Sequence, residues 1–213
     1  RARRVVCVEK DRRMAEFLRK RVEPLGNVVV VEGDFLRIDP PRVSKVVSNP
    51  PYSIASPLLF KILDMEVELA VLTLQKEFAQ RMTAQPGTRG YGRLTVSVSL
   101  RANVEHVEYV PSSKFFPKPK VDSVVVRIIP KQHPPEASHP RFGQIVAALF
   151  SQRRRSLSKA LRHLIDISGS TSEAVLKKMP RSLLEKRVYQ LEPIEFLEVY
   201  QILCKEGVFG DKA

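Results

Sequence analysis

Residues 46–56 read VVSNPPYSIAS, so that an amide, two prolines and an aromatic ring directly follow an apolar run. The valine-rich run at 43–47 predicts a buried strand. Each proline ring fixes its own φ and keeps the preceding residue out of the helical region, so Asn49 and Pro50 cannot form a helical turn. The segment therefore predicts a strand that ends in a rigid turn with an outward-facing backbone carbonyl.

Short valine-rich runs alternate with amphipathic segments on both sides of this turn. Such alternation is typical of a parallel sheet covered by helices. Two long period-2 stretches, 94–104 and 121–129, predict an antiparallel pair that completes a mixed sheet. The other expected strands are 4–8, 28–31, 43–47 and 68–74, and the expected helices are 12–22, 55–63 and 76–83.

The pattern changes after residue 130. Residues 130–140 contain four prolines, as is typical of a linker. Only helical patterns follow, at 142–150, 156–164, 171–178 and 193–205. We therefore predict an α/β domain over residues 1–130, a linker over 131–140 and a small all-helical domain over 141–213.

Composition restricts the possible partners. Lys and Arg number 36 against 23 Asp and Glu, and the formal net charge of +13 attracts polyanions such as RNA, DNA or an anionic membrane surface. No apolar run approaches the roughly 20 residues that span a bilayer. Two cysteines, Cys7 and Cys204, are too few for a metal site. We expect a cytoplasmic protein without membrane or metal association.

Polar residues lie at or just after the ends of three predicted strands: Glu9, Asp34 and Asn49. In open α/β sheets, ligands bind beyond the carboxyl ends of the strands, so we expect these residues on one rim. Acidic side chains there can accept hydrogen bonds from ribose hydroxyls and an adenine amino group. With no phosphate-binding lysine motif, S-adenosylmethionine fits. Each residue alone would be interpreted as a helix cap or a surface acid.

The turn after the strand at 43–47 suits methylation of an exocyclic amine. The lone pair of such a nitrogen is delocalised into its ring, so an enzyme must accept both amino hydrogens and turn the nitrogen toward a methyl donor. The side-chain oxygen of Asn49 and the backbone carbonyl of Pro50 are two fixed acceptors, and Tyr52 offers a face for stacking the base. The alternative is that Asn-Pro-Pro only forms a turn.

The segment NPPY resembles the motif of the amino methyltransferases. Three further segments resemble, more narrowly, the ribosomal small-subunit RNA adenine N6,N6-dimethyltransferases, or dimethyladenosine transferases. They are LQKEFAQRM with YGRLTVSVSL within 74–100, SSKFFPKPKVDSVVVRIIP at 112–130 and LFSQRRRSLSKAL at 149–161. The resemblance covers nearly the whole chain. It implies a Rossmann-like S-adenosylmethionine-dependent methyltransferase sheet with a helical RNA-binding domain.

The resemblance also implies an activity and site residues. Two adjacent adenosines near the 3′ end of small-subunit ribosomal RNA would each receive two methyl groups at N6 during ribosome biogenesis, and a monomer would bind the pre-ribosomal small subunit. The cofactor-binding residues would be Glu9, Lys10, Asp34, Phe35 and Asn49, and the catalytic segment would be Asn49, Pro50, Pro51 and Tyr52. Phe115 would flank the target base opposite Tyr52, although the adjacent Phe116 could instead be the residue that faces the base.

Basic residues form two groups that we expect to bind RNA. Lys114, Lys118 and Lys120 surround prolines that hold their segment extended. Arg153, Arg154 and Arg155 are predicted to start a helix, where cations oppose the macrodipole but a bound phosphate would suit both the arginines and the free N–H groups. The alternative for both groups is a solvated, charged face.

The resemblance further implies a catalytic domain that begins with a strand and a glycine-rich turn, which hold the methionine end of the cofactor. No glycine-rich turn precedes the strand at 4–8, so we expect a sheet without its central strand. We expect the chain to be the retained part of a longer protein; the alternative is a form that binds the cofactor badly. Two rival functions remain. A protein-glutamine N5-methyltransferase could use NPPY on a planar amide, and a non-catalytic ribosome-assembly factor would keep only the RNA-binding surface.

Overall fold

The computed structural model describes residues 2–168 and 172–208. The chain forms two compact units, one of Arg1–Ser44 with Pro51–Val67 and the other of Lys45–Pro50 with Glu68–Ala213. The strands of the described residues form two sheets, two-stranded β1–β2 and four-stranded β3–β4–β6–β5. The sequence predicted a single sheet that lacks its central strand.

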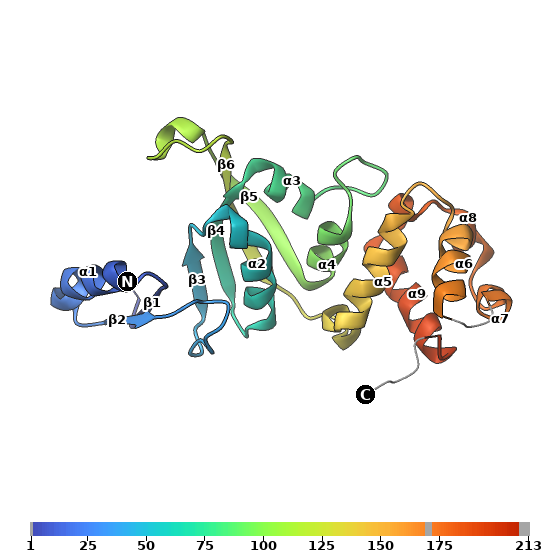
Figure 1. Ribbon diagram of the computed structural model, residues 1–213, viewed down its shortest axis with the longest axis horizontal. Helices are drawn as coiled ribbons and strands as arrows, with labels where there is room; N and C mark the ends of the chain where they lie inside the picture. The colour runs from blue at the N-terminus through green and yellow to red at the C-terminus, as the bar shows by residue number, and fades with distance from the viewer. Residues whose placement is uncertain (1, 169–171, 209–213) are drawn as a thin grey trace. The chain divides into compact units, whose positions relative to one another are not determined.

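The first unit begins with a parallel strand pair joined by a helix. Strand β1 (Val5–Glu9) pairs in register with β2 (Val28–Glu32), so Glu9 lies opposite Glu32. Helix α1 (Arg12–Val22) connects them and contacts both strands (Figure 1). Asp11 caps this helix by accepting hydrogen bonds from the backbone N–H groups of Arg13 and Met14. The three elements confirm the sequence prediction.

The rest of the first unit follows the double proline. A single 3₁₀ turn (η2, Tyr52–Ile54) leads into α2 (Ala55–Asp64), which confirms the helix expected at 55–63. The helix buries an apolar stripe at i, i+1, i+4 and i+5 and ends where Met65 takes an extended conformation. The buried leucines and isoleucine are Leu58, Leu59, Ile62 and Leu63.

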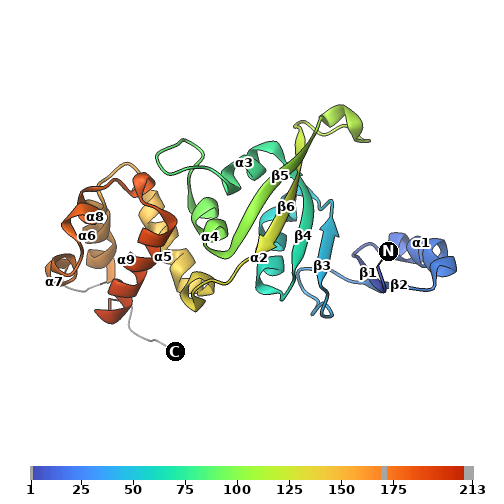
Figure 2. The same ribbon diagram turned by 180° about the vertical axis from the view of Figure 1, so that it is seen from behind.

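The second unit contains the mixed sheet. Strand β3 (Lys45–Ser48) is parallel to β4 (Leu69–Gln75), and β6 (Ser123–Pro130) is antiparallel to both β4 and the edge strand β5 (Ala102–Val110) (Figure 2). The two central strands alternate buried and less buried residues, as expected of strands with one face in a core. Their buried apolar residues are Ala70, Leu72, Leu74, Val124, Val126 and Ile128.

Strand β3 is less buried than the sequence predicted. It lies at one edge of its sheet, with β4 as its neighbour. Val47 is 81% exposed, and Lys45 is exposed as well. A run of valines therefore indicated the strand correctly but not its burial, because the cover of an edge strand depends on what packs beside it.

Helix α3 (Lys76–Met82) is where the sequence predicted it, but the next prediction is wrong. Residues 93–101 form helix α4 (Arg93–Arg101) and not a strand, and β5 begins only at Ala102. Only Arg93 of this helix is exposed, so the helix is covered on nearly every side. A helix with that much burial needs no polar face, and its apolar residues can therefore follow a period other than 3.6.

The C-terminal part is helical, as predicted, and one short helix was missed. The expected helices correspond to α5 (Pro140–Ser151), α6 (Leu157–Ser168), α7 (Ser172–Lys177) and α9 (Pro193–Lys205), whereas α8 (Arg181–Glu185) was not expected. Thr171, predicted as helical, lies outside the described residues. The remaining 3₁₀ turns are η1 (Glu23–Leu25), η3 (Ser112–Lys114), η4 (Pro135–Ser138) and η5 (Val188–Gln190).

One hydrophobic core joins α4 to the C-terminal helices. It contains Tyr91 and Val96 beside residues of α5, α6 and α9, such as Phe142, Leu161 and Phe196. The hydroxyl of Tyr91 donates to the carbonyl oxygen of Leu191 at 2.6 Å. The core therefore extends across residues 131–140, and the division into domains at that linker stays a prediction.

Candidate methyltransferase site and RNA-binding surface

Four of the five residues predicted to bind a cofactor, Glu9, Lys10, Asp34 and Phe35, lie at or just after the carboxyl ends of β1 and β2. The backbone N–H of Gly33 donates to the carbonyl oxygen of Glu9 at 2.8 Å, and Lys10 Nζ lies 2.9 Å from Asp34 Oδ2. Gly33 has φ +159, and a Cβ there would come within 2.9 Å of the Ile38 side chain. A glycine thus permits the close turn that brings Asp34 next to the end of β1.

The two carboxylates of this group differ in their contacts. One oxygen of Glu9 accepts a hydrogen bond from the backbone N–H of Asp11 at 2.8 Å. Asp34 accepts from Lys10 and, through its other oxygen, from the N–H of Leu36 at 3.0 Å. The hydrogen bond from Lys10 is the main cause that lowers the pKa of Asp34, so this carboxylate is ionised at neutral pH.

Phe35 lies beside a second cation. The ammonium group of Lys61 lies 5.3 Å from the centroid of the Phe35 ring and also donates to the carbonyl oxygen of Ile38. Phe35 is half-buried. The loop after β2 therefore carries a half-buried aromatic ring directly after Asp34 in the sequence.

The NPPY segment directly follows β3, as predicted. Asn49 is exposed and Pro50 is buried. Pro51 has an extended backbone, with φ −53 and ψ 133, and its carbonyl oxygen accepts from the N–H of Ile54 at 3.0 Å. The half-buried Tyr52 opens the 3₁₀ turn. Because the unit boundary falls between Pro50 and Pro51, the rim shared by Glu9, Asp34 and Asn49 stays a prediction.

Phe115 and Phe116 have different environments in the segment between β5 and β6, residues 111–122. Phe115 is half-buried and its N–H donates to the Ser112 carbonyl oxygen at 3.2 Å. Phe116 has a relative accessibility of 102%, as high as for a free phenylalanine. Lys114, Lys118 and Lys120 are exposed, and within the described residues none of their ammonium groups has a hydrogen-bond or ion-pair partner.

The root of this segment is fixed by a contact that the sequence prediction missed. The carboxylate of Asp122 accepts hydrogen bonds from the hydroxyl of Tyr109 and, at 2.9 Å, from the N–H of Ser112. The carbonyl oxygen of Asp122 accepts from the N–H of Lys76 at 2.9 Å, and the Lys76 ammonium lies 5.0 Å from the Tyr109 ring centroid. We call Tyr109, Ser112 and Asp122 the root cluster. The sequence signal was an acid and an aromatic on either side of one loop.

Arg153, Arg154 and Arg155 lie in the turn between α5 and α6 and do not start a helix, which corrects the prediction. Helix α6 begins at Leu157. Arg153 donates to the carbonyl oxygens of Arg89 at 3.2 Å and Thr88 at 3.0 Å, and its guanidinium lies 5.5 Å from the Tyr189 ring centroid. Arg153 therefore has a structural role in joining this turn to residues far away in the sequence.

The other two arginines of the turn border a basic cavity. Its volume is about 630 Å³, and its lining residues are Arg154, Arg155, Ser156, Lys159, Glu185 and Arg187. Glu185 is already paired with Arg181 at 2.9 Å. The sequence prediction missed Lys159, which could have been found four residues after Arg155, and also Arg187, which only the tertiary structure brings here.

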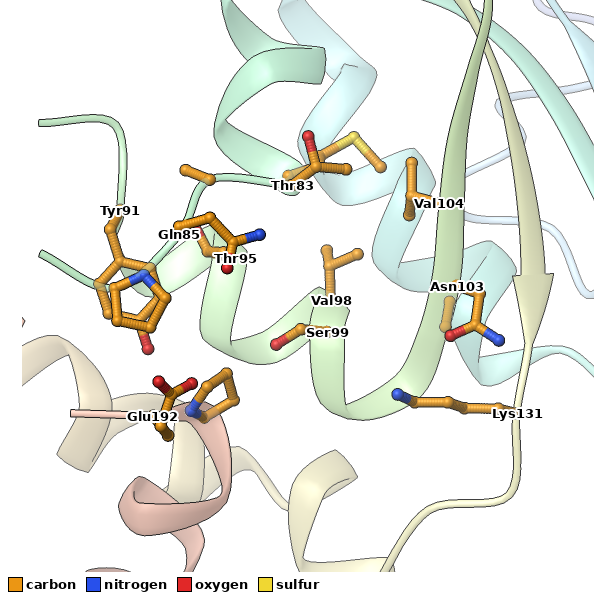
Figure 3. A pocket seen from close by; sticks show the side chains of 15 residues that line it. Thr83, Gln85, Tyr91, Thr95, Val98, Ser99, Asn103, Val104, Lys131 and Glu192 are labelled. Carbon is orange, nitrogen blue, oxygen red and sulfur yellow. The ribbon is translucent and has the colours of Figure 1, made fainter. Parts of the chain in front are cut away.

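A second cavity, of about 340 Å³, lies between the end of α3, helix α4, the start of β5 and the start of α9. Figure 3 shows Tyr91 and Glu192 on one side of it, with Lys131 and Asn103 on the other. None of the predicted catalytic, cofactor-binding or RNA-binding residues lines it. It is therefore separate from the candidate site.

Within residues 2–168 and 172–208, no group of three or more His, Cys, Asp or Glu residues is placed to hold a metal ion. In the same ranges no helix has both the length and the apolar character that crossing a membrane requires.

The mixed sheet, the helices that accompany it and the NPPY segment after β3 define a Rossmann-like methyltransferase class. The profile of the family described as ribosomal RNA adenine dimethylase matches residues 1–205. The chain belongs to this family.

Similar sequences and structures agree with this assignment. The chain is 43% identical over 214 residues to the probable ribosomal RNA small subunit methyltransferase A of Thermococcus kodakarensis, covering 98% of the chain and 75% of the relative. The protein of the same description from Methanothermobacter thermautotrophicus is 46% identical over 199 residues, covering 92% and 71%.

Two solved structures are similar over most of the chain. A dimethyladenosine transferase from Plasmodium falciparum has a TM-score of 0.81 at 31% identity, covering 96% of this chain and 83% of that one. The 23S rRNA methyltransferase ErmE has a TM-score of 0.65 at 27% identity, with the same coverage. Both support the Rossmann-like fold class that the sequence predicted.

Proposed function

We propose that the chain uses S-adenosylmethionine to dimethylate N6 of two adjacent adenosines near the 3′ end of small-subunit ribosomal RNA. The observation that carries the proposal is Asn49-Pro50-Pro51-Tyr52 directly after β3, in a chain of the ribosomal RNA adenine dimethylase family. Its partner would be the pre-ribosomal small subunit, bound by a monomer in the cytoplasm. The similarity to small-subunit methyltransferases favours this RNA.

The residues after β1 and β2 fit a nucleoside with a ribose and an adenine. Glu9 uses one carboxylate oxygen for the Asp11 N–H, and its second oxygen can accept from ribose hydroxyls. Asp34 would accept from the adenine amino group, with the Phe35 ring against the base. Lys10 holds the Asp34 carboxylate in place through their ion pair. When bound, S-adenosylmethionine supplies an electrophilic methyl group on a sulfonium.

The NPPY segment would hold the substrate nitrogen. The Asn49 side-chain oxygen and the Pro50 carbonyl would accept its two hydrogens, and the two proline rings restrict the backbone that carries the second acceptor. Tyr52 stacks on one face of the target adenine and Phe115 on the other. These contacts localise the lone pair on N6, so no general base is needed before transfer.

The basic surface would bind the RNA backbone. Lys114, Lys118 and Lys120 have exposed ammonium groups, and Arg154 and Arg155 border the basic cavity. Both the lysine segment and the basic cavity suit RNA phosphates, because each offers several cations to the RNA backbone. Lys159 and Arg187 join this surface, whereas the structural contacts of Arg153 argue against a phosphate-binding role for that residue.

Asn49→Ala tests the proposal. We expect kcat for methyl transfer from labelled S-adenosylmethionine to undermethylated small ribosomal subunits to fall about a hundredfold or more, as when one oriented polar group of a catalytic centre is removed. Affinity for the subunit should stay unchanged, because the amino group of the target base is the only part of the RNA that Asn49 would contact. The label should appear in N6,N6-dimethyladenosine.

The matched control is Asn103→Ala, which removes an exposed asparagine from the edge strand β5 and should leave kcat unchanged. Equal losses of kcat and affinity in Asn49→Ala would contradict the catalytic role. Subunit binding without any transfer by the wild type would favour the assembly factor. Transfer to a glutamine-containing protein substrate would favour the N5-methyltransferase. Transfer to large ribosomal subunits alone would indicate that the substrate is 23S rRNA, as for ErmE.

A further inference from the structure

We propose that Phe116 is a stacking platform for an unpaired nucleobase next to the target adenosine, with Lys114, Lys118 and Lys120 on the flanking phosphates. The inference rests on the proposed function, since it takes RNA as the ligand. Phe116 would provide a second base-binding position, distinct from the one proposed for Phe115. The RNA would occupy this position before methyl transfer.

The first observation is the exposure of Phe116. Its side chain has a relative accessibility of 102%, while the adjacent Phe115 is half-buried. Tyr109, at 50%, and Val121, at 43%, are further exposed apolar side chains of the same part of the chain. Covering an exposed phenylalanine ring with a flat ligand is favourable, because apolar surface is removed from water.

The second observation is that the segment is fixed at its base. The Asp122 carboxylate joins Tyr109 on β5 to the N–H of Ser112, and the Asp122 carbonyl joins the segment to α3 through the Lys76 N–H. The N–H groups of Lys114 and Phe115 donate to Pro111 and Ser112. Figure 1 shows this segment extending past the ends of β5 and β6. Because the root of the segment is held by these hydrogen bonds, its backbone loses little conformational entropy when the exposed ring binds a ligand.

The third observation is charge. Lys114, Lys118 and Lys120 surround Phe116 in the sequence, and no carboxylate stands between residues 111 and 121. Within the described residues their ammonium groups have no hydrogen-bond or ion-pair partner. An aromatic ring among unpaired cations is the combination with which proteins bind single-stranded nucleic acid, since bases stack and phosphates pair. A neutral protein partner would leave all three cations unpaired.

The experiment uses the absence of tryptophan from the sequence. Phe116→Trp gives the intact protein a single tryptophan, whose emission can be excited selectively over that of the tyrosines, and a base stacked on the indole quenches this emission. Titration with a single-stranded oligoadenylate should quench the emission strongly, whereas an abasic oligomer of equal length and charge should not. Ile194→Trp, at a position that is 60% exposed on α9, is the matched control and should not respond to either oligomer.

Two further variants measure the contribution of the ring. Phe116→Tyr should bind undermethylated small subunits as the wild type does, and Phe116→Leu should bind about fivefold or more weakly, because the loss of one base–aromatic stack has that order of effect. Since Phe116 is fully exposed, neither change should alter the midpoint of unfolding.

Each remaining outcome separates the two proposals. Equal quenching by the abasic oligomer, or full affinity in Phe116→Leu while the wild type methylates RNA, would overturn the stacking platform and leave the proposed function intact. If the emission of the Phe116→Trp variant shifted to the blue with anionic phospholipid vesicles and not with oligoadenylate, the segment would be assigned to a membrane. A wild type that neither binds nor methylates RNA would remove the proposed function itself.

Discussion

The two basic segments of this protein look alike in sequence and differ in structure. In residues 111–122, three lysines have exposed, unpartnered ammonium groups within the described part of the chain, and the contacts that fix the segment come from Asp122, Tyr109 and Ser112. In the turn at 152–156, Arg153 itself is the fixing residue, because it donates to the carbonyl oxygens of Thr88 and Arg89. The lysines of residues 111–122 lie on a segment that other residues fix, whereas one of the arginines fixes the turn at 152–156.

The difference shows that a run of cations does not define a binding surface. A guanidinium has five donors in a planar fork and can serve backbone carbonyls as well as phosphates, whereas an ammonium on a long stem stays hydrated unless an anion approaches. The arginines at 153–155 thus divide their roles, with Arg153 turned to the protein and Arg154 and Arg155 at the basic cavity. Mutations should separate the two segments clearly.

The largest effect should come from replacing Lys114, Lys118 and Lys120 by Ala together. We expect RNA affinity at low salt to fall by about tenfold or more. The slope of log K against the logarithm of salt concentration should become shallower by about 2, because each single-strand phosphate contact that is lost removes about 0.7 from it. The free energy of unfolding should change by no more than about 0.5 kcal/mol, because these side chains are exposed. Binding titrations at several salt concentrations, with denaturant melts, measure both; an unchanged slope would show a merely solvated face.

An intermediate effect, on stability, should follow from Arg153→Ala. The change removes two charged hydrogen bonds and a ring contact, so the free energy of unfolding should fall by about 1–2 kcal/mol in denaturant melts. Arg153→Lys should recover little of this, since one ammonium cannot reproduce the fork. Arg154→Ala is the control, with full stability and weaker RNA binding. If Arg153→Ala were as stable as the wild type and only RNA affinity fell, the contrast between the segments would disappear.

The smallest effect should come from Tyr109→Phe, which removes only the hydroxyl of the root cluster. The Tyr109 hydrogen bond is the first cause that lowers the pKa of Asp122 from 3.8, followed by the Ser112 N–H, and the same bond raises the pKa of Tyr109 above 10.0. The Asp122 carboxylate stabilises the folded protein at a pH above its pKa in the unfolded chain. This stabilisation is lost as the pH falls through the lower pKa that Asp122 has in the folded protein. The contribution of Tyr109 is present below its unfolded pKa and lost as pH rises through its folded pKa.

Denaturation midpoints of the wild type and Tyr109→Phe should therefore differ slightly at pH 7 and converge once the pH falls below the lowered pKa of Asp122 in the folded protein. Tyr189→Phe is the control, because the half-buried Tyr189 lies against Arg153 and is no part of the root cluster. Its difference from the wild type should not change over the same pH range. A constant difference between the wild type and Tyr109→Phe, from pH 7 down through the pH range in which Asp122 becomes protonated, would show that the hydroxyl acts independently of the carboxylate.

Most elements could be predicted from local sequence alone. The bounds of α1 and α9 were predicted at 12–22 and 193–205, because Asp11 caps one helix and Pro193 opens the other. Strands β1, β2, β3 and β4 were predicted within two residues at each end because their apolar runs are short and bounded by polar residues. The chemical candidates Glu9, Asp34 and Asn49 also came from local pattern.

Helix α4 shows where local pattern fails. Leu94, Val96, Val98 and Leu100 alternate as in a strand, yet these residues form a helix that is buried on nearly every side. Thr95 fixes its first turn by accepting from the Gly92 N–H and donating to the Arg81 carbonyl oxygen at 2.6 Å. The packing of α4 against α5 and α9 outweighs the β-propensity of its residues.

The sequence by itself determined the family, most of the helices and strands, and the residue types of the candidate site, because these depend on neighbours along the chain. Only the tertiary structure decided that Phe116 is exposed while Phe115 is half-buried, that Tyr109 and Asp122 fix their loop, and that Arg187 joins Arg154 at one cavity. These facts depend on contacts between residues far apart in the sequence or on which side chains the fold covers. Burial and long-range pairing arise only when the chain is folded.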